Sequence, residues 1–456
     1  MIRVRFALSP TGHLLISGAR VALANYLFAR STRGRMLLRL DDLDTERAPP
    51  AYAEQIMQDL RWFGIDWDES LRQSARTERY QATIEQLKRD KFLYPCFESE
   101  AELKAKQEFR RKRNLSPVYD RAMLGLTEKQ RQDAEAGGKR PHWRFKLSGR
   151  TLAWTDLLLG ARSAVLSAVS DPIVVRDDGR PTAMLASVVD DIDYGTTHII
   201  RGEDNIGNTA TQIELFGVLR GSETKIRFGH LPAHGGSSRP PAGGNQAPVL
   251  DGSNTPGGRR ASGLSLRGLR NDGVEPVSIA ACMTGADAAT GDPTTLEKLT
   301  EQFDLTELAA ARFDVTQMLA INRMVLGELD FAAVADRLPG GATEAFWLAV
   351  RGSLDLLKEA RGWWDVVAGT IVPPVIEGAR DLLLAAGELL PAEPWDNAVW
   401  TKWITALEQA TGRSGSSLFE PLRLALTGEE DGPDLAELLP LIGRARAASR
   451  LEIAAS

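Results

Sequence analysis

Two polar segments near the N-terminus have the residue types of a ligand-binding crevice. Ser-Pro-Thr-Gly at residues 9–12 follows a short strand-like run at residues 4–7, and the acidic residues 41–44 follow a second run at residues 36–40. A helix is expected between them, at about residues 19–28. Because ligands of open α/β sheets bind at the carboxyl ends of the strands, residues 9–18 and 41–44 are expected on one rim of one crevice. This order of elements predicts the opening of a doubly wound nucleotide-binding domain.

The cysteines provide neither a zinc site nor a disulfide framework. Cys96 and Cys282 are the only two in the chain and lie far apart in sequence. Four thiol ligands or several bridged pairs therefore cannot be assembled. We expect no protein-bound zinc and no other metal site built from these residues.

The α/β pattern resumes after a charged stretch. An exposed helix is expected at residues 98–113, strands at 171–175 and 186–189, and a third strand at 197–201 that leads into a helix ending near residue 219. Residues 234–258 contain seven Gly and four Pro, a composition typical of a flexible loop. From residue 299 onward apolar residues recur at helical spacing, which predicts an all-helical region.

Length, composition and charge narrow the class of protein. A chain of 456 residues predicts about three domains, and 43% hydrophobic with 25% charged residues is typical of packed globular domains. No apolar run reaches the ~18 residues of a membrane span, so we expect a cytoplasmic protein that does not enter membranes. Residues 301–456 carry a net charge of −11 and residues 1–300 one of +5. An acidic region is a poor surface for phosphate backbones. The alternative explanation is that the negative charge only keeps a helical domain soluble.

Motifs spread over the whole chain resemble the glutamyl-tRNA synthetase family of class I synthetases, in its alpha-proteobacterial form. They lie at residues 5–12, 18–20, 38–44, 94–97, 154–156, 188–191, 200–204, 229–232, 346–347, 363–364 and 421–428. The resemblance implies an α/β fold: a Rossmann-type class I synthetase catalytic domain split by an inserted α/β domain and followed by an all-helical C-terminal region. It assigns residues 1–90 and 171–233 to the catalytic domain, 91–170 to the acceptor-binding-type insert, 234–258 to a flexible insertion, 259–300 to a signature-loop remnant with a stem-contact region, and 301–456 to an anticodon-binding-type domain.

The family makes glutamyl-adenylate from glutamate and ATP with Mg²⁺ and then transfers glutamate to tRNA. Its first ATP signature, His-Ile-Gly-His or His-Ile-Gly-Gly, matches Leu15, Ile16, Ser17 and Gly18 here. The resemblance implies that the missing histidine would stabilise the phosphates as charge develops. Its replacement by Leu15 removes that donor.

The second ATP signature is a lysine loop, Leu-Ser-Lys-Arg in this family. Alignment on residues 263–270 places Arg259 at the lysine position, followed by Arg260 and preceded by Gly-Gly. An arginine carries the charge, but its planar fork differs from a point charge on a flexible stem. One such electrostatic donor contributes about 10²–10³ in rate, so losing two predicts adenylation slowed by ~10⁴ or more.

The amino-acid pocket is better preserved. The residues that match the family's glutamate-binding positions are Arg5, Ser9, Asp41, Ala183, Ser187 and Arg201. Two guanidinium groups suit the two carboxylates of glutamate, and Asp41 suits its ammonium group. Ala183 stands where the family has a tyrosine, which implies room for a bulkier glutamate derivative. The alternative is that Arg5 and Arg201 only pair with Asp42 and Glu203.

Three functional hypotheses follow. The chain is a paralogue without ordinary tRNA glutamylation that binds a glutamate-like ligand or acts as a scaffold for a protein partner. Alternatively, it is a ligase that joins glutamate to a non-tRNA amine, or an active second synthetase of restricted tRNA choice in which Arg259 or Arg260 replaces the lysine. The acidic C-terminal region argues against strong tRNA binding.

Overall fold

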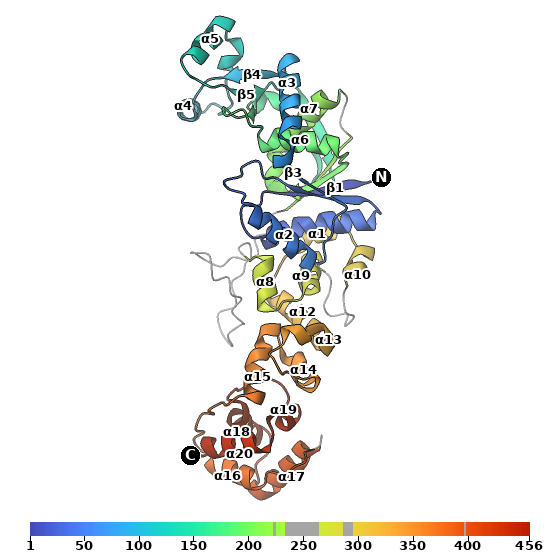
Figure 1. Cartoon of the computed structure of the whole chain (residues 1–456), viewed down its shortest axis with the longest axis vertical. Helices are drawn as coiled ribbons and strands as arrows, with labels where there is room; N and C mark the ends of the chain where they lie inside the picture. Colours follow the sequence, from blue (N-terminus) through green and yellow to red (C-terminus); the bar gives the residue numbers. More distant parts are fainter. Residues whose placement is uncertain (222–224, 233–263, 286–294, 396–397) are drawn as a thin grey trace.

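The computed structural model describes residues 1–221, 225–232, 264–285, 295–395 and 398–456. Figure 1 shows an elongated molecule, with the α/β elements at one end and the C-terminal helices at the other. Arg259, Arg260 and the Gly/Pro-rich residues 234–258 lie outside the described residues.

The N-terminal elements form the predicted strand, helix, strand unit. Three parallel strands lie in the order β1-β2-β3, with Leu8 of β1 opposite Leu40 of β2. The strand ends therefore bring residues 9 and 41 close together, and the Asp41 N–H donates to the Leu8 carbonyl at 2.8 Å. The elements of this unit are β1 (Arg3–Leu8), α1 (Ile16–Ser31), β2 (Arg35–Leu40), α2 (Pro50–Trp62) and β3 (Glu69–Arg72).

Helix α1 begins three residues before the expected start. Its first turn therefore contains Ile16, Ser17 and Gly18, and Leu15 is the residue before the helix. A buried face that includes Ala19, Ala22 and Leu23 packs against the sheet core. The degenerate first ATP signature thus lies at the N-terminus of α1.

A second sheet continues beside the first. Its strand order is β7-β6-β10-β9, and β9 lies beside β1, where the Thr197 N–H donates to the Arg3 carbonyl at 2.9 Å. The strands and neighbouring helices are β6 (Thr151–Asp156), β7 (Gly160–Val165), β9 (His198–Gly202), β10 (Arg227–Leu231), α3 (Thr77–Arg89), α6 (Ala183–Asp193) and α7 (Ile206–Arg220).

The strand predicted at residues 186–189 is wrong, because these residues lie within helix α6. Every side chain from Leu185 to Asp191 is buried, including three polar ones, so the helix has no exposed face in this stretch. Its apolar residues form only a short run, and periodicity alone does not distinguish such a run in a buried helix from a strand.

A third, three-stranded antiparallel sheet has the order β4-β5-β8. This sheet contains β8, which comes from the segment assigned to the second catalytic half. By contrast, β6 and β7 come from the segment assigned to the insert, but they belong to the sheet that also contains β9 and β10. Strand pairing thus crosses the boundary expected near residue 170. The elements are β4 (Leu93–Cys96), α4 (Glu100–Lys112), α5 (Glu128–Ala136), β5 (His142–Phe145) and β8 (Ile173–Val175).

The all-helical region after residue 299 is confirmed within the described residues. Its later helices share a core of their own, which includes Trp347, Trp403 and Leu439. The helices after the sheets are α8 (Leu266–Asp272), α9 (Pro276–Thr284), α10 (Leu296–Glu301), α11 (Leu305–Ala310), α12 (Val315–Glu328), α13 (Phe331–Val334), α14 (Glu344–Val350), α15 (Ala360–Ala368), α16 (Arg380–Glu388), α17 (Val399–Thr411), α18 (Ser416–Thr427), α19 (Leu435–Ile442) and α20 (Arg444–Ala454). None of the helices described combines the length and apolar character needed to cross a membrane.

Candidate active site

A cavity of about 210 Å³ lies where β1, β2, β9, α6 and α7 meet. Five of the six predicted pocket residues line it: Arg5, Asp41, Ala183, Ser187 and Arg201. The sixth, Ser9, follows β1 directly but is exposed and does not line this cavity. The other lining residues are Ala7, Val21, Arg39, Met184, Ile200, Asn205, Asn208 and Gln212.

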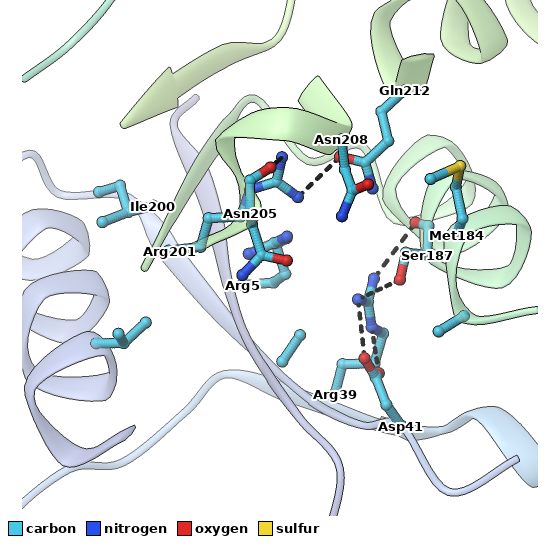
Figure 2. A pocket seen from close by; sticks show the side chains of 13 residues that line it. Arg5, Arg39, Asp41, Met184, Ser187, Ile200, Arg201, Asn205, Asn208 and Gln212 are labelled. Atoms are coloured by element: carbon cyan, nitrogen blue, oxygen red, sulfur yellow. Dashed lines mark hydrogen bonds and ion pairs between the residues drawn. The ribbon is translucent and has the colours of Figure 1, made fainter. Parts of the chain in front are cut away.

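One side of the pocket is organised by Arg39, which the sequence analysis did not single out. Its guanidinium donates to both Asp41 carboxylate oxygens, at 2.7 and 3.3 Å, and to the Ser187 hydroxyl at 2.9 Å. Figure 2 shows these three side chains as one bonded group. Burial alone would lower the pKa of Arg39, but Asp41 and Asp191 outweigh it and raise that pKa. The sequence offered one signal for a role of Arg39, namely that it is a charged residue inside the otherwise apolar run at residues 36–40.

Arg5 lies on the central strand β1 and is 5% exposed. Its Nε donates to the Asp191 carboxylate at 3.2 Å, whereas Asp42 accepts hydrogen bonds from Ser74. The expected alternative pairing of Arg5 with Asp42 is therefore wrong. Burial lowers the pKa of Arg5, and Asp191 opposes this effect.

Arg201 forms the other charged side of the pocket. It donates to Gln212 Oε1 at 2.8 Å, Thr209 Oγ1 at 2.9 Å, the Asn205 carbonyl at 3.2 Å and His230 Nε2 at 3.2 Å (Figure 2 draws the Gln212 bond). All four acceptors are neutral, and Arg201 makes no ion pair with the described residues. Burial, followed by repulsion from Arg5, lowers the pKa of Arg201 to about 9.

A buried Asp156 and His230 pair stands behind Arg201. Asp156 Oδ2 lies 2.5 Å from His230 Nδ1, and both side chains are 0% exposed. Burial raises the pKa of Asp156, but hydrogen bonds from His230 and from backbone N–H groups outweigh it, so the pKa is lowered overall. Both residues lie in motifs that carry the family resemblance, at residues 154–156 and 229–232, but their contact spans 74 positions and depends on the pairing of β6 with β10.

The ion pairs around the pocket are distributed unevenly. Three guanidinium groups, of Arg5, Arg39 and Arg201, face the Asp41 and Asp191 carboxylates. A further carboxylate, Asp190, lies 4.0 Å from Arg39 but is bonded to the additional cation Arg76. Asp204 also acts electrostatically on Arg201, and the ionised Asp156 lies behind it, but neither forms an ion pair with its guanidinium. Arg201 is therefore the cation of the pocket wall that an anionic ligand would pair with.

The four residues of the degenerate ATP signature do not line this cavity. Leu15 is 40% exposed at the N-cap position of α1 and cannot donate a hydrogen bond from its side chain. The first N–H of the helix, on Ile16, donates to the Leu264 carbonyl at 2.9 Å, just after the stretch that holds Arg259 and Arg260. Within the described residues, no group of three or more His, Cys, Asp or Glu side chains is arranged to hold a metal ion.

Comparisons with known proteins agree over the whole chain. Residues 1–233 match the family model described as tRNA synthetases class I (E and Q), catalytic domain, and residues 375–455 match an anticodon binding domain. A relative from Acidiphilium cryptum, named "Glutamate--tRNA ligase 2", is 51% identical over 100% of both chains. A second relative of that name, from Granulibacter bethesdensis, is 50% identical over 99% of this chain and 98% of its own.

Solved structures show the same architecture. A glutamate tRNA ligase from Elizabethkingia meningosepticum, in complex with its amino acid, superposes with a TM-score of 0.78 at 25% identity and 99% coverage of both chains. A glutamate-tRNA synthetase from Elizabethkingia anophelis gives a TM-score of 0.79 at 25% identity, covering 100% of this chain and 99% of its own. The predicted class I synthetase fold is confirmed, and the chain belongs to the glutamyl-tRNA synthetase family of class I aminoacyl-tRNA synthetases.

Proposed function

We propose that the chain recognises glutamate in the pocket between β1, β2, β9 and α6, and that it has lost ordinary tRNA glutamylation. In this proposal it acts as a glutamate-binding protein. The observation that carries the proposal is the contrast between Arg201, a buried cation without a carboxylate partner among the described residues, and Leu15, an apolar side chain at the ATP signature. Arg201 favours an anionic amino acid as ligand, and Leu15 disfavours fast adenylation.

Arg201, which has no ion pair with the described residues, distinguishes glutamate from glutamine. Free glutamate carries one net negative charge at neutral pH, whereas glutamine carries none. The side-chain carboxylate of glutamate would supply the ion pair that Arg201 lacks, whereas the amide of glutamine would leave this buried cation unpaired, which is costly. Asp41 and Ser187 lie on one side of the pocket and Arg201 on another (Figure 2). This arrangement supports a pose with the ammonium group at Asp41 and the side-chain carboxylate at Arg201.

The ATP site supports the second part of the proposal. Class I synthetases use ATP and Mg²⁺, and the N-terminus of a helix is a suitable place for phosphate. At α1, however, the side chain is that of Leu15, and the Ile16 N–H is already used by Leu264. The described residues thus fit the phosphates of ATP poorly.

The second candidate is an active second glutamyl-tRNA synthetase with restricted tRNA choice. The names of the full-length relatives and the match of residues 375–455 to an anticodon binding domain favour it. The same match does not support our expectation of weak tRNA binding. In this candidate Arg259 or Arg260 carries the charge of the missing lysine.

Three measurements on the full chain test the proposal. Calorimetry should show binding of L-glutamate, and glutamate-dependent exchange of pyrophosphate into ATP should be absent. Charging of total tRNA should also be absent. Robust exchange with charging would establish the second candidate. Exchange without charging, together with AMP release that depends on an added amine, would point to a ligase with a non-tRNA acceptor.

A further inference from the structure

The tautomer of His230 follows from the chemistry of its two neighbours. The Nε–H of Arg201 can only donate, so the His230 Nε2 atom at 3.2 Å must hold a lone pair. The proton of the neutral ring therefore sits on Nδ1, where it is donated to Asp156 at 2.5 Å. The Thr209 hydroxyl, 3.0 Å from the same Nε2, is also able to donate to it.

Backbone N–H groups hold Asp156 in place independently of the His230 side chain. Its Oδ1 atom accepts backbone N–H groups from Leu158 and Leu159 at 3.1 Å and from His230 at 3.2 Å. The carboxylate therefore stays ionised and fixed, and its second oxygen is aimed at the imidazole. The chain Asp156, His230, Arg201 thus connects β6, β10 and β9 by hydrogen bonds between buried side chains.

We propose that Asp156 and His230 form a buried relay that orients the Arg201 guanidinium, so that His230 is a specificity-determining positioning residue for the side-chain carboxylate of the ligand. Four hydrogen bonds engage Arg201, and a guanidinium has five N–H donors, so at least one donor has no partner among the described residues. The relay fixes the direction of that donor. This inference rests on the proposed glutamate pocket.

Two substitutions of His230 separate orientation of Arg201 from simple packing. In His230→Asn the amide can take the place of Nδ1 and bond Asp156, but nothing replaces Nε2 as the acceptor for Arg201. In His230→Gln the longer side chain can place an acceptor at Nε2, and the bond to Asp156 is lost instead. Asp156→Asn is the third variant, because an amide facing Nδ1 favours the opposite tautomer and turns two donors toward each other.

The experiment measures the dissociation constants of L-glutamate and L-glutamine by calorimetry. Failure of the unaltered chain to bind glutamate would reject the proposed function itself, whatever the relay does. If it binds, His230→Asn and Asp156→Asn should weaken glutamate about tenfold or more and leave glutamine within about twofold. His230→Gln should keep most of the preference. Equal loss for both ligands, or a larger loss in His230→Gln than in His230→Asn, would overturn the relay.

A measurement on the unaltered chain keeps the test decisive if the variants do not fold. The ¹⁵N chemical shifts of the imidazole nitrogens report the tautomer, and only five histidines contribute to the spectrum. His230 should be neutral with its proton on Nδ1. A proton on Nε2, or a doubly protonated ring at neutral pH, would exclude the relay.

Discussion

Leu15 occupies the position that the resemblance assigns to a phosphate-stabilising histidine. Its side chain is 40% exposed, so a polar replacement there should cost little stability. We expect Leu15→His to raise glutamate-dependent pyrophosphate exchange above the background of the unaltered chain, by up to about 10²–10³. Leu15→Gln is the matched control, because it is polar without an imidazole and should stay at background. A similar rate in both variants would mean that this position does not limit adenylation.

The two cysteines give a prediction about reactivity. Burial raises the pKa of both Cys96 and Cys282 to about 11, so each thiol stays protonated at neutral pH. Because the thiolate is the reactive form, neither should react with Ellman's reagent at pH 7.5 in the native protein. In denaturant both should react. A thiol that reacts in the native chain as fast as free cysteine would contradict the burial seen here.

At the residue scale, the family motifs indicated residues around the pocket better than the partners of those residues. Arg5, Asp41 and Arg201 line the cavity, and each belongs to a motif on, or directly after, a strand of a recognisable sheet. His230 and Arg39 were missed as site residues. Their roles depend on Asp156 and Ser187, which are far away in sequence, and no local pattern encodes such pairings.

The element scale shows why Arg39 matters beyond the pocket. It bonds Asp41 after β2, and it bonds Ser187 and Asp191 on α6, so one side chain ties the strand to the helix. Arg39→Met would leave the Asp41 carboxylate without its cation and the buried Asp191 with Arg5 alone, and we expect a loss of about 3–5 kcal/mol in the free energy of unfolding. Urea denaturation measures it.

Two other variants calibrate this prediction. Ser187→Ala removes one hydrogen bond to a charged group and should cost about 1–3 kcal/mol. Arg47→Met removes an exposed arginine 3.8 Å from Asp44, and its stability should be nearly unchanged. If Arg39→Met were no more destabilising than Arg47→Met, the link between β2 and α6 would not be structural.

Helix α6 shows where secondary structure could not be predicted correctly from the sequence. Strands β1, β2 and β9 were placed within two residues because turns and polar residues bound each apolar run. In α6 the apolar run is buried on every side, and a short run of that kind fits a strand equally well. Only its packing against α7 and α3 distinguishes the two.

At the scale of the whole molecule, the core is divided. The cluster that includes Trp347, Trp403 and Leu439 contains none of the pocket residues, and six of the ten tryptophans lie within residues 347–403. The change of net charge at residue 301 does not mark this division, because Leu308, Met318 and Ile321 belong to the core cluster that also contains the strand and helix residues of the N-terminal unit. The relative placement of the sheets depends on contacts between residues far apart in sequence. Strand β6 of the expected insert pairs with β10, and β8 of the expected second catalytic half pairs with β5, so both pairings cross the expected domain boundary.

A core substitution in α19 tests this division. Leu439 is 0% exposed, so Leu439→Ala should lower the stability of the helical end by about 2–5 kcal/mol. Tryptophan fluorescence should report an earlier transition, whereas the dissociation constant of glutamate and the protection of Cys96 and Cys282 should stay unchanged. Leu384→Ala, at a position that is 45% exposed, is the control and should leave the transition in place. Parallel loss of glutamate binding and thiol protection would instead mean that both ends unfold as one cooperative unit, and that mutations far from the pocket act on it through global stability.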